Sequence, residues 1–171
     1  MLERFRNDPA LAAVGAILIL ALATIASAFV FQALGFAPCD LCYKQRIPYY
    51  VGIPLAALGF GLAAAGLRGI LPAALTLLAL IFVSSVILGA YHAGVEWDFW
   101  RGPADCTGTF AKNESMADFL QQLQTVKVVR CDVVDIRILG LSLAGWNAVV
   151  SALLVGIAVA GLGNLRRGAK S

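Results

Sequence analysis

The chain has 171 residues, of which 60% are hydrophobic and only 13% are charged, roughly half the charged share of an ordinary soluble domain. A soluble domain of this length could not bury so much apolar surface, so the composition excludes that class and favours a membrane protein. The net charge of +3 is small and dispersed, which gives no indication of nucleic-acid binding. We expect one integral-membrane domain over residues 1–171.

Four segments of the chain contain no Asp, Glu, Lys or Arg. These runs cover residues 9–38, 47–67, 69–95 and 138–165. Each is long enough for a spanning helix, which needs about 20 mostly apolar residues. The sequence therefore predicts an all-α membrane protein, an antiparallel four-helix transmembrane bundle. Its spans are expected at about 10–34, 47–65, 70–91 and 139–161.

The first apolar run has a second interpretation. Arg4 and Arg6 precede it, and Ala26-Ser27-Ala28 resembles the small-residue cleavage site of a secretory signal peptide. The run is long for the apolar region of a signal peptide, and it continues past that site to Phe36. These features favour an uncleaved first helix.

Four spans place both chain ends on the same side of a membrane, and six basic residues share that side: Arg4, Arg6, Arg68, Arg166, Arg167 and Lys170. Basic residues are enriched in cytoplasmic segments, so we expect the termini in the cytoplasm. The loops at about 35–46 and 92–138 would then face the periplasm of a bacterial inner membrane.

The long loop at about 92–138 contains an amphipathic pattern. Ser115 and Asp118 have the spacing of a capping box at a helix start. The apolar residues that follow fall on one helical face: Met116, Phe119, Leu120 and Leu123. The pattern predicts a short amphipathic helix on the membrane surface, or one folded over the rest of the loop.

Two further patterns concern the spans themselves. Ala148, Ala152, Gly156 and Ala160 recur every four residues, which is typical of a close helix seam in lipid but also follows from the abundance of Ala and Gly. Aromatic residues gather near the outer ends of the second and third spans, where we interpret them as interfacial anchors. They are Tyr49, Tyr50, Tyr91, Trp97 and Trp100.

The chain has four cysteines, all in the two outer loops. Cys39 and Cys42 form a Cys-x-x-Cys pair before the second span, whereas Cys106 and Cys131 lie between the third and fourth spans. An even number of cysteines on one side of a membrane indicates disulfides. Cys42 lies near the start of a helix and close to Arg46, conditions that favour a reactive thiolate. The pair is therefore interpreted as redox-active.

Cysteines with other roles follow different patterns. A c-type haem site needs a histidine after the second cysteine, but position 43 is Tyr. A structural zinc site needs two closely spaced ligand pairs, and Cys106 and Cys131 are far apart, so no metal is expected. Two purely structural disulfides remain the main rival interpretation.

Two polar residues at the outer ends of spans are further candidates. His92 is the single histidine, and an ionisable group near the bilayer is a functional candidate, although an interfacial role is the simpler interpretation. Arg46 could reach to lipid headgroups. Its position four residues after Cys42 places it on the same helical face.

The cysteine motif and its surroundings resemble the disulfide bond formation protein B (DsbB) family. The resemblance covers nearly the whole chain: the four-span layout, two cysteines in the second outer loop, and Gly140-Leu141-Ser142-Leu143 before the last span. Its most specific part is Pro38-Cys39-Asp40-Leu41-Cys42-Tyr43-Lys44-Gln45-Arg46.

This resemblance implies a membrane protein-thiol:quinone oxidoreductase that reoxidises a periplasmic DsbA-like thiol oxidase. Cys106 would form the mixed disulfide with that partner, and Cys131 would be its loop partner. Cys39 would exchange with the second-loop cysteines, and Cys42 would face the quinone, ubiquinone in the first place and menaquinone as the alternative. Arg46 and His92 would lie beside the quinone.

Two other functions are compatible with a membrane bundle that carries these cysteines. The first is a non-enzymatic membrane scaffold with structural disulfides. The second is a vitamin K epoxide reductase-like enzyme, in which the quinone-facing cysteine pair comes late in the chain. In this sequence the Cys-x-x-Cys pair comes first, which ranks that enzyme lower.

Overall fold

The computed structural model describes residues 8–103, 129–134 and 136–168. Within them, the chain forms long helices, a 3-10 turn η1 at Arg68–Ile70, and a two-stranded hairpin of β1 (Arg137–Ile138) and β2 (Leu141–Ser142). The long helices are α2 (Pro9–Ala33), α3 (Asp40–Ala64), α4 (Leu71–Glu96) and α6 (Leu143–Gly168). Each is long and apolar enough to cross a membrane. The predicted four-helix membrane bundle is confirmed.

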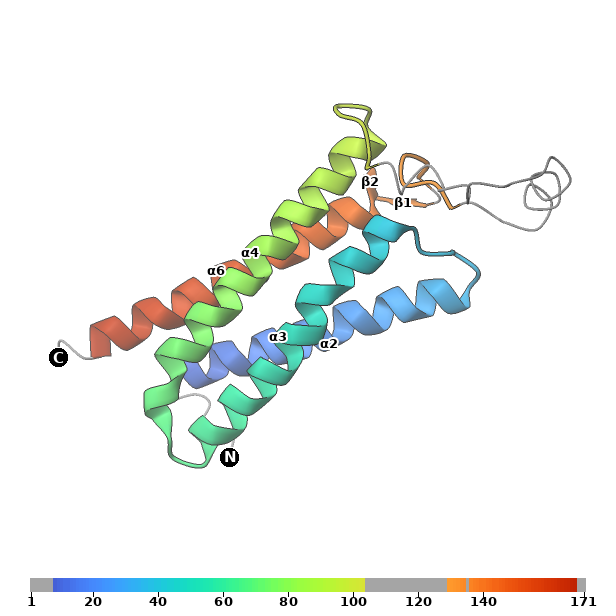
Figure 1. Cartoon of the computed structure of the whole chain (residues 1–171). Coiled ribbons are helices and arrows are strands. Elements are labelled where there is room, and N and C mark those ends of the chain that lie inside the picture. The colour runs from blue at the N-terminus through green and yellow to red at the C-terminus, as the bar shows by residue number, and fades with distance from the viewer. Residues whose placement is uncertain (1–7, 104–128, 135, 169–171) are drawn as a thin grey trace, which may run out of the picture.

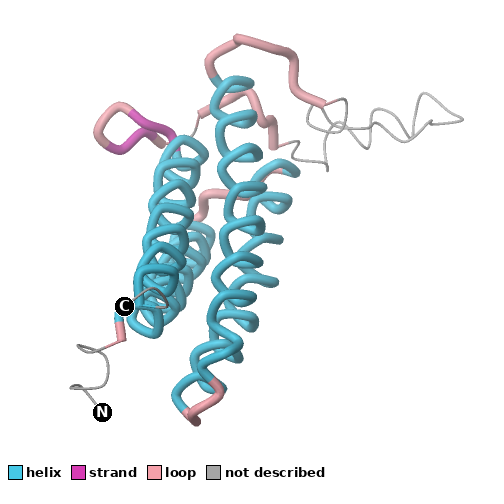
Figure 2. Tube along the Cα trace, turned by 90° about the vertical axis from the view of Figure 1, so that its left-hand side faces the viewer, coloured by secondary structure: helices cyan, strands magenta, loops and turns pink. Residues whose placement is uncertain are grey.

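Successive helices run in opposite directions, and α4 packs along α6 while α2 packs against α3 and α6 (Figures 1 and 2). The beginning of α2 and the end of α6 lie at one end of the bundle. Arg68 belongs to that end as well, because it pairs with Asp8, the residue that caps α2. The first residues of α3 and the hairpin lie at the opposite end.

The helices extend beyond the apolar runs that predicted them. α3 was expected from about residue 47 but begins at Asp40, and α4 was expected to about 91 but ends at Glu96. The apolar run marks the part of a helix that suits lipid, whereas the helix itself continues until its backbone is capped. Cys39 caps α3 by accepting the backbone N–H of Cys42. Which residues of each helix lie inside the membrane stays a prediction.

The last long helix begins later than expected, at Leu143 instead of about 139. Residues 137–142 form the hairpin, which turns through Leu139 and Gly140, both at positive φ. Ser142 then accepts the backbone N–H of Gly145 and so caps the first turn of α6. The amphipathic helix expected around 115–123 lies outside the described residues.

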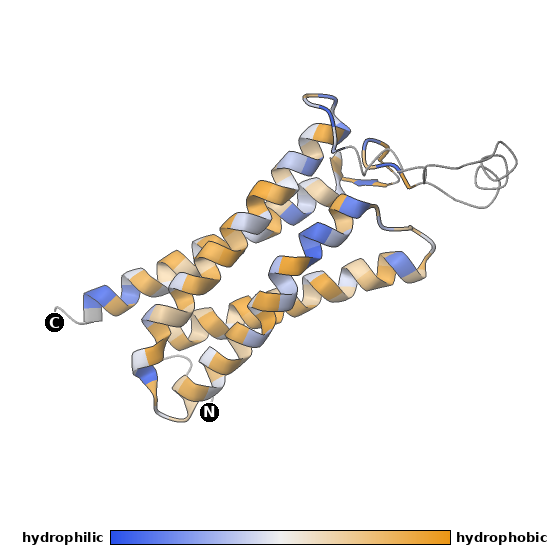
Figure 3. Cartoon of the chain, in the orientation of Figure 1, coloured by the Kyte–Doolittle hydropathy of each residue, from blue (hydrophilic) through white to orange (hydrophobic). Residues whose placement is uncertain are grey.

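Most positions along the helices are apolar, and the start of α3 carries a group of strongly hydrophilic residues, with others near the ends of α2 and α6 (Figure 3). A helix that is apolar all round belongs in a lipid or a protein interior. The buried centre of the bundle is built from aliphatic and aromatic side chains: Ile17, Leu71, Leu75, Leu78, Phe82 and Leu154. Polar groups at one end therefore stand out as the candidate site.

The seam between α4 and α6 differs from the expected column of small residues. Ala148 does face α4, but Ala152, Gly156 and Ala160 are exposed. A spacing of four residues advances by more than one helical turn, so a column built on it drifts around the helix. The buried residues of α6 are instead spaced by seven, three and four positions, which keeps them on one helical face: Ala144, Ser151, Leu154 and Ala158.

Gly89 brings the α4 and α6 backbones into close contact. A Cβ at this position would lie 2.9 Å from the Ala148 nitrogen and 3.1 Å from the Ala144 oxygen. We expect Gly89→Ala to destabilise the bundle by about 1–3 kcal/mol, since backbone atoms cannot move aside. Thermal unfolding in detergent would measure this loss. Gly156→Ala is the matched control, because nothing lies within 4 Å of its Cβ position. Equal melting temperatures for the two variants would contradict the close contact between the α4 and α6 backbones at Gly89.

Candidate redox site

Cys39 and Cys42 lie together at the start of α3. Cys39 is the buried N-cap residue, and Cys42 follows one turn later and is half-buried. Their Sγ atoms are 2.6 Å apart, and both are free thiols in this structure. Since a disulfide requires an S–S separation of about 2.05 Å, the pair can close and open with little movement of the backbone.

The pKa of Cys39 is raised above its usual range, first because its side chain is hydrogen-bonded to Cys42 and second because it is buried. Cys39 therefore keeps its proton when only one of the two sulfurs is ionised. The expectation that Cys42, beside the helix start and Arg46, is the reactive thiolate stays a prediction.

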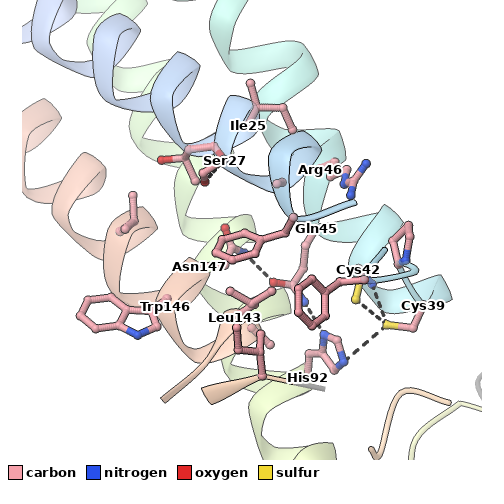
Figure 4. A pocket seen from close by; sticks show the side chains of 18 of the residues that line it. Ile25, Ser27, Cys39, Cys42, Gln45, Arg46, His92, Leu143, Trp146 and Asn147 are labelled. Atoms are coloured by element: carbon pink, nitrogen blue, oxygen red, sulfur yellow. Dashed lines mark hydrogen bonds between the residues drawn. The ribbon is translucent and has the colours of Figure 1, made fainter. Parts of the chain in front are cut away.

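His92, near the end of α4, contacts Cys39 of the first cysteine pair (Figure 4) and also the second outer loop. Its Nε2 atom is 3.7 Å from Cys39 Sγ and 3.2 Å from the backbone oxygen of Cys131. Cys131 is buried and disulfide-bonded. The side-chain donor atoms of Cys39, His92 and Cys131 all lie within 4.8 Å of one another. Cys106 lies outside the described residues.

The same three residues have the composition of a metal site, but their chemistry here is different. A cysteine binds a metal ion through its thiolate, and the Cys131 sulfur is already part of a disulfide. A disulfide-bonded sulfur within reach of the Cys39 thiol is instead suited to thiol–disulfide exchange, which requires a thiol close to a disulfide.

Arg46 is held on the other side of Cys42 by contacts from two helices. Its Nη1 donates to Gln32 Oε1 on α2 at 2.8 Å. Its guanidinium lies 5.0 Å from the ring centre of Phe29 and 5.3 Å from that of Tyr43. Such contacts fix the direction of a planar cation. The Arg46 guanidinium is therefore held in one direction beside Cys42, and its side chain does not extend freely to lipid headgroups.

A cavity of about 520 Å³ lies beside these residues, between α2, α3, α6 and the segment 129–138. Polar side chains from α3 and α4 meet at one part of its wall: Cys39, Cys42, Gln45, Arg46, His92 and Glu96. The remaining wall is mostly apolar, with Phe31, Leu143 and Trp146 among its residues. A mostly apolar cavity with a few converging polar groups is the usual form of a small-molecule site.

Several polar residues of the site were not predicted from the sequence. Gln45 and Asn147 meet between α3 and α6, where Asn147 Nδ2 donates to Gln45 Oε1 at 2.7 Å. Glu96 was counted with the aqueous loop, but its side chain is only 7% exposed and accepts a hydrogen bond from Ser142. A usable signal existed for Asn147, since an amide inside an apolar span marks a functional position.

The interpretation of Tyr49 as an interfacial residue was wrong. Tyr49 was expected to be an interfacial anchor, but it is buried at 2% exposure and its ring packs edge-on against Phe82. Its hydroxyl bonds to Asn147 and Ser151 on α6. Apolar neighbours on both sides of Tyr49 in the sequence hid the polar partners that α6 brings to it.

Fold and site together define a multi-pass membrane protein. It has a Cys-x-x-Cys dithiol that lies beside Cys131, a cysteine of the second outer loop that is disulfide-bonded. Residues 10–161 match the family model described as "Disulfide bond formation protein DsbB". The chain therefore belongs to the DsbB family, whose members are membrane oxidoreductases of disulfide bond formation. This confirms the resemblance found in the sequence and favours an enzyme over a stapled scaffold.

The chain is also similar to a protein of Rickettsia prowazekii (strain Madrid E) that is named only as uncharacterized. The two are 28% identical over 122 residues, which cover 70% of this chain and 68% of that relative. No solved structure matches the chain.

Proposed function

We propose that the protein is a thiol:quinone oxidoreductase of the bacterial inner membrane. It would oxidise a periplasmic thioredoxin-fold partner of the DsbA type and deliver the electrons to a membrane quinone, ubiquinone or menaquinone. The observation that carries this proposal is the place of the Cys39–Cys42 dithiol, which has disulfide-bonded Cys131 on one side and the apolar cavity on the other. Overall, partner dithiol plus quinone gives partner disulfide plus quinol.

The residues around the cavity fit a quinone. Apolar side chains of α2 and α6 suit its ring and prenyl tail, and N–H groups suit its oxygens. Arg46 uses one N–H for Gln32, and a guanidinium carries five. When bound, a quinone supplies a sink for two electrons and two protons. Arg46 would orient it and favour the ionised form of Cys42, because an opposite charge stabilises a thiolate.

The sulfurs provide a balanced path for the electrons. The partner's thiolate attacks Cys106 and releases Cys131; the partner's second thiol then displaces Cys106 and leaves as a disulfide. Cys131 next attacks the oxidised Cys39–Cys42 pair at Cys39, and Cys106 resolves that bond. The Cys39–Cys42 dithiol so formed loses two electrons and two protons to the quinone. We assign Cys106 as the bonded partner of Cys131 because Cys39 and Cys42 are free thiols.

The proposed orientation places the cysteines in the periplasm. Arg68, Arg166 and Arg167 lie toward the end of the bundle opposite to the cysteines, which fits the enrichment of basic residues on the cytoplasmic side. After reduction, a membrane-impermeant maleimide should label the cysteines in intact spheroplasts. Labelling only after lysis would contradict this orientation.

Quinone absorbance is the direct test of the reaction. The purified protein, mixed with a reduced DsbA-like oxidase and excess ubiquinone or menaquinone analogue, should convert many equivalents of quinone to quinol. A scaffold with structural disulfides would convert none with any partner or quinone.

Cys131→Ser should prolong the complex with the partner. In this variant Cys106 has no disulfide for the partner to attack, so its thiolate instead attacks the disulfide of the oxidised partner; the resulting mixed disulfide then lacks the Cys131 thiol that would reverse it by displacing the partner. We expect a covalent complex to accumulate in cells and to disappear on reduction, and mass spectrometry of it would identify the partner. Cys106→Ser is the control and should trap nothing; equal trapping by both variants would refute the assigned order.

A further inference from the structure

We propose that Tyr49, Asn147 and Gln45 form a positioning chain that holds His92 as a neutral imidazole with its proton on Nε2. His92 would then act as a hydrogen-bond donor to the cysteine centre and not as its base. The proposal deepens the proposed function, because it assigns a role to the group at which the two cysteine pairs meet.

The argument starts from Cys131. Its backbone oxygen lies 3.2 Å from His92 Nε2, and a carbonyl oxygen can only accept a hydrogen bond. The Nε2 atom must therefore carry a proton. The same atom is 3.7 Å from Cys39 Sγ and 3.8 Å from Glu96 Oε1, so its N–H faces the second-loop backbone, the sulfur and the carboxyl group of Glu96.

Gln45 decides the state of the other ring nitrogen. Its Nε2 atom lies 2.5 Å from His92 Nδ1, whereas its Oε1 atom accepts from Asn147 Nδ2 at 2.7 Å. Since the Gln45 oxygen is turned to Asn147, the amide N–H faces the ring, and Nδ1 accepts. A nitrogen that accepts carries no proton. His92 is thus assigned one tautomer and no charge.

Tyr49 is the next partner of Asn147 in this chain of hydrogen bonds. Its hydroxyl donates to Asn147 Oδ1 at 2.8 Å and also contacts Ser151 Oγ at 3.1 Å. Ser151 in turn bonds to Ser85, and both are fully buried. Amide directions are decided by such networks. The donor order then runs from Tyr49 through Asn147 and Gln45 to His92, and Figure 4 shows its last part, from Asn147 to His92.

This tautomer determines what His92 can do. A base for Cys39 would need a lone pair on Nε2, but that atom presents an N–H. An N–H directed at sulfur stabilises the negative charge that Cys39 gains as it leaves a disulfide. The same N–H ties the Cys131 backbone to α4, so the second-loop sulfur stays beside Cys39.

Nitrogen NMR tests the assignment without any turnover. His92 is the only histidine of the chain, so histidine labelled with ¹⁵N, in protein purified through a tag without histidine, gives signals from this ring alone. We expect a protonated, pyrrole-type Nε2 and an unprotonated, pyridine-type Nδ1. A proton on Nδ1, alone or in an imidazolium, would overturn the proposal whether or not the protein reduces quinone.

Asn147→Leu tests the chain that holds the ring. It removes the donor to Gln45, so we expect a second population with the proton on Nδ1. Exchange between Cys39 and the second-loop cysteines should slow by about tenfold, as for the loss of one buried hydrogen bond. Asn164→Leu is the matched control, with the same change near the other end of α6, and should alter neither.

Tyr49→Phe is a second, milder variant in case Asn147→Leu does not fold. It removes one hydroxyl from the chain and should shift the tautomer population in the same direction. An unchanged ring spectrum together with an unchanged exchange rate, in whichever variant folds, would show that the chain does not position His92.

Discussion

Cys42→Ser is expected to abolish catalytic quinone reduction, with turnover falling by roughly 10³-fold or more, the scale of losing a reacting nucleophile. A serine hydroxyl cannot form a disulfide with Cys39, so the dithiol that would deliver two electrons to the quinone no longer exists. The rate of quinol formation with reduced partner present in excess measures the loss.

The same variant should keep its first exchange with the partner. The disulfide that contains Cys131 does not involve Cys42, so the variant should oxidise one equivalent of partner dithiol and then stop. This single round serves as the control for folding. Multiple turnovers by Cys42→Ser would contradict the proposed path.

Arg46→Gln should weaken the quinone step and spare the exchange with the partner. Removing the guanidinium takes away the positive charge that favours ionised Cys42 and the donors assigned to the quinone. Each pKa unit of lost stabilisation corresponds to about 1.4 kcal/mol, so we expect a roughly tenfold rise in quinone KM or fall in quinone reduction rate per unit. Arg46→Lys should rescue poorly, since lysine lacks the planar fork of donors that contacts Gln32.

Lys44→Gln is the matched control for charge on the same helix. Lys44 is half exposed and pairs with Asp40 on the first turn of α3, and it does not line the cavity. We expect near-normal quinone kinetics from it. Steady-state rates with varied quinone, and then with varied partner, separate the two steps. An Arg46→Gln protein that keeps normal quinone kinetics and loses only partner turnover would refute the role given to Arg46.

The sequence was sufficient for the helices and for the cysteine motif because both are local signals. A charge-free run predicts a span by its own length, and Cys39 and Cys42 are neighbours on one helical turn. Arg46 was recognised for the same reason, since it lies one turn after Cys42 and on its helical face.

The contacts of His92 could not be predicted in this way. Gln45 and Asn147 are 102 positions apart, and only the crossing of α3 and α6 brings them together. Glu96 was assigned to the aqueous loop because a charge ends an apolar run, yet α4 continues through it and Ser142 satisfies it. The hydropathy of a residue depends only on its own type, whereas its burial depends on which helix packs against it.

The measurement that tests the central claim most directly is a single turnover of the isolated dithiol. A protein carrying Cys106→Ser and Cys131→Ser retains only Cys39 and Cys42, and can be reduced, freed of reductant and mixed anaerobically with quinone. We predict one equivalent of quinol per protein and the loss of both free thiols, which become a Cys39–Cys42 disulfide. No quinol, with both thiols still titratable and the protein folded, would contradict the claim that this pair delivers electrons to a quinone.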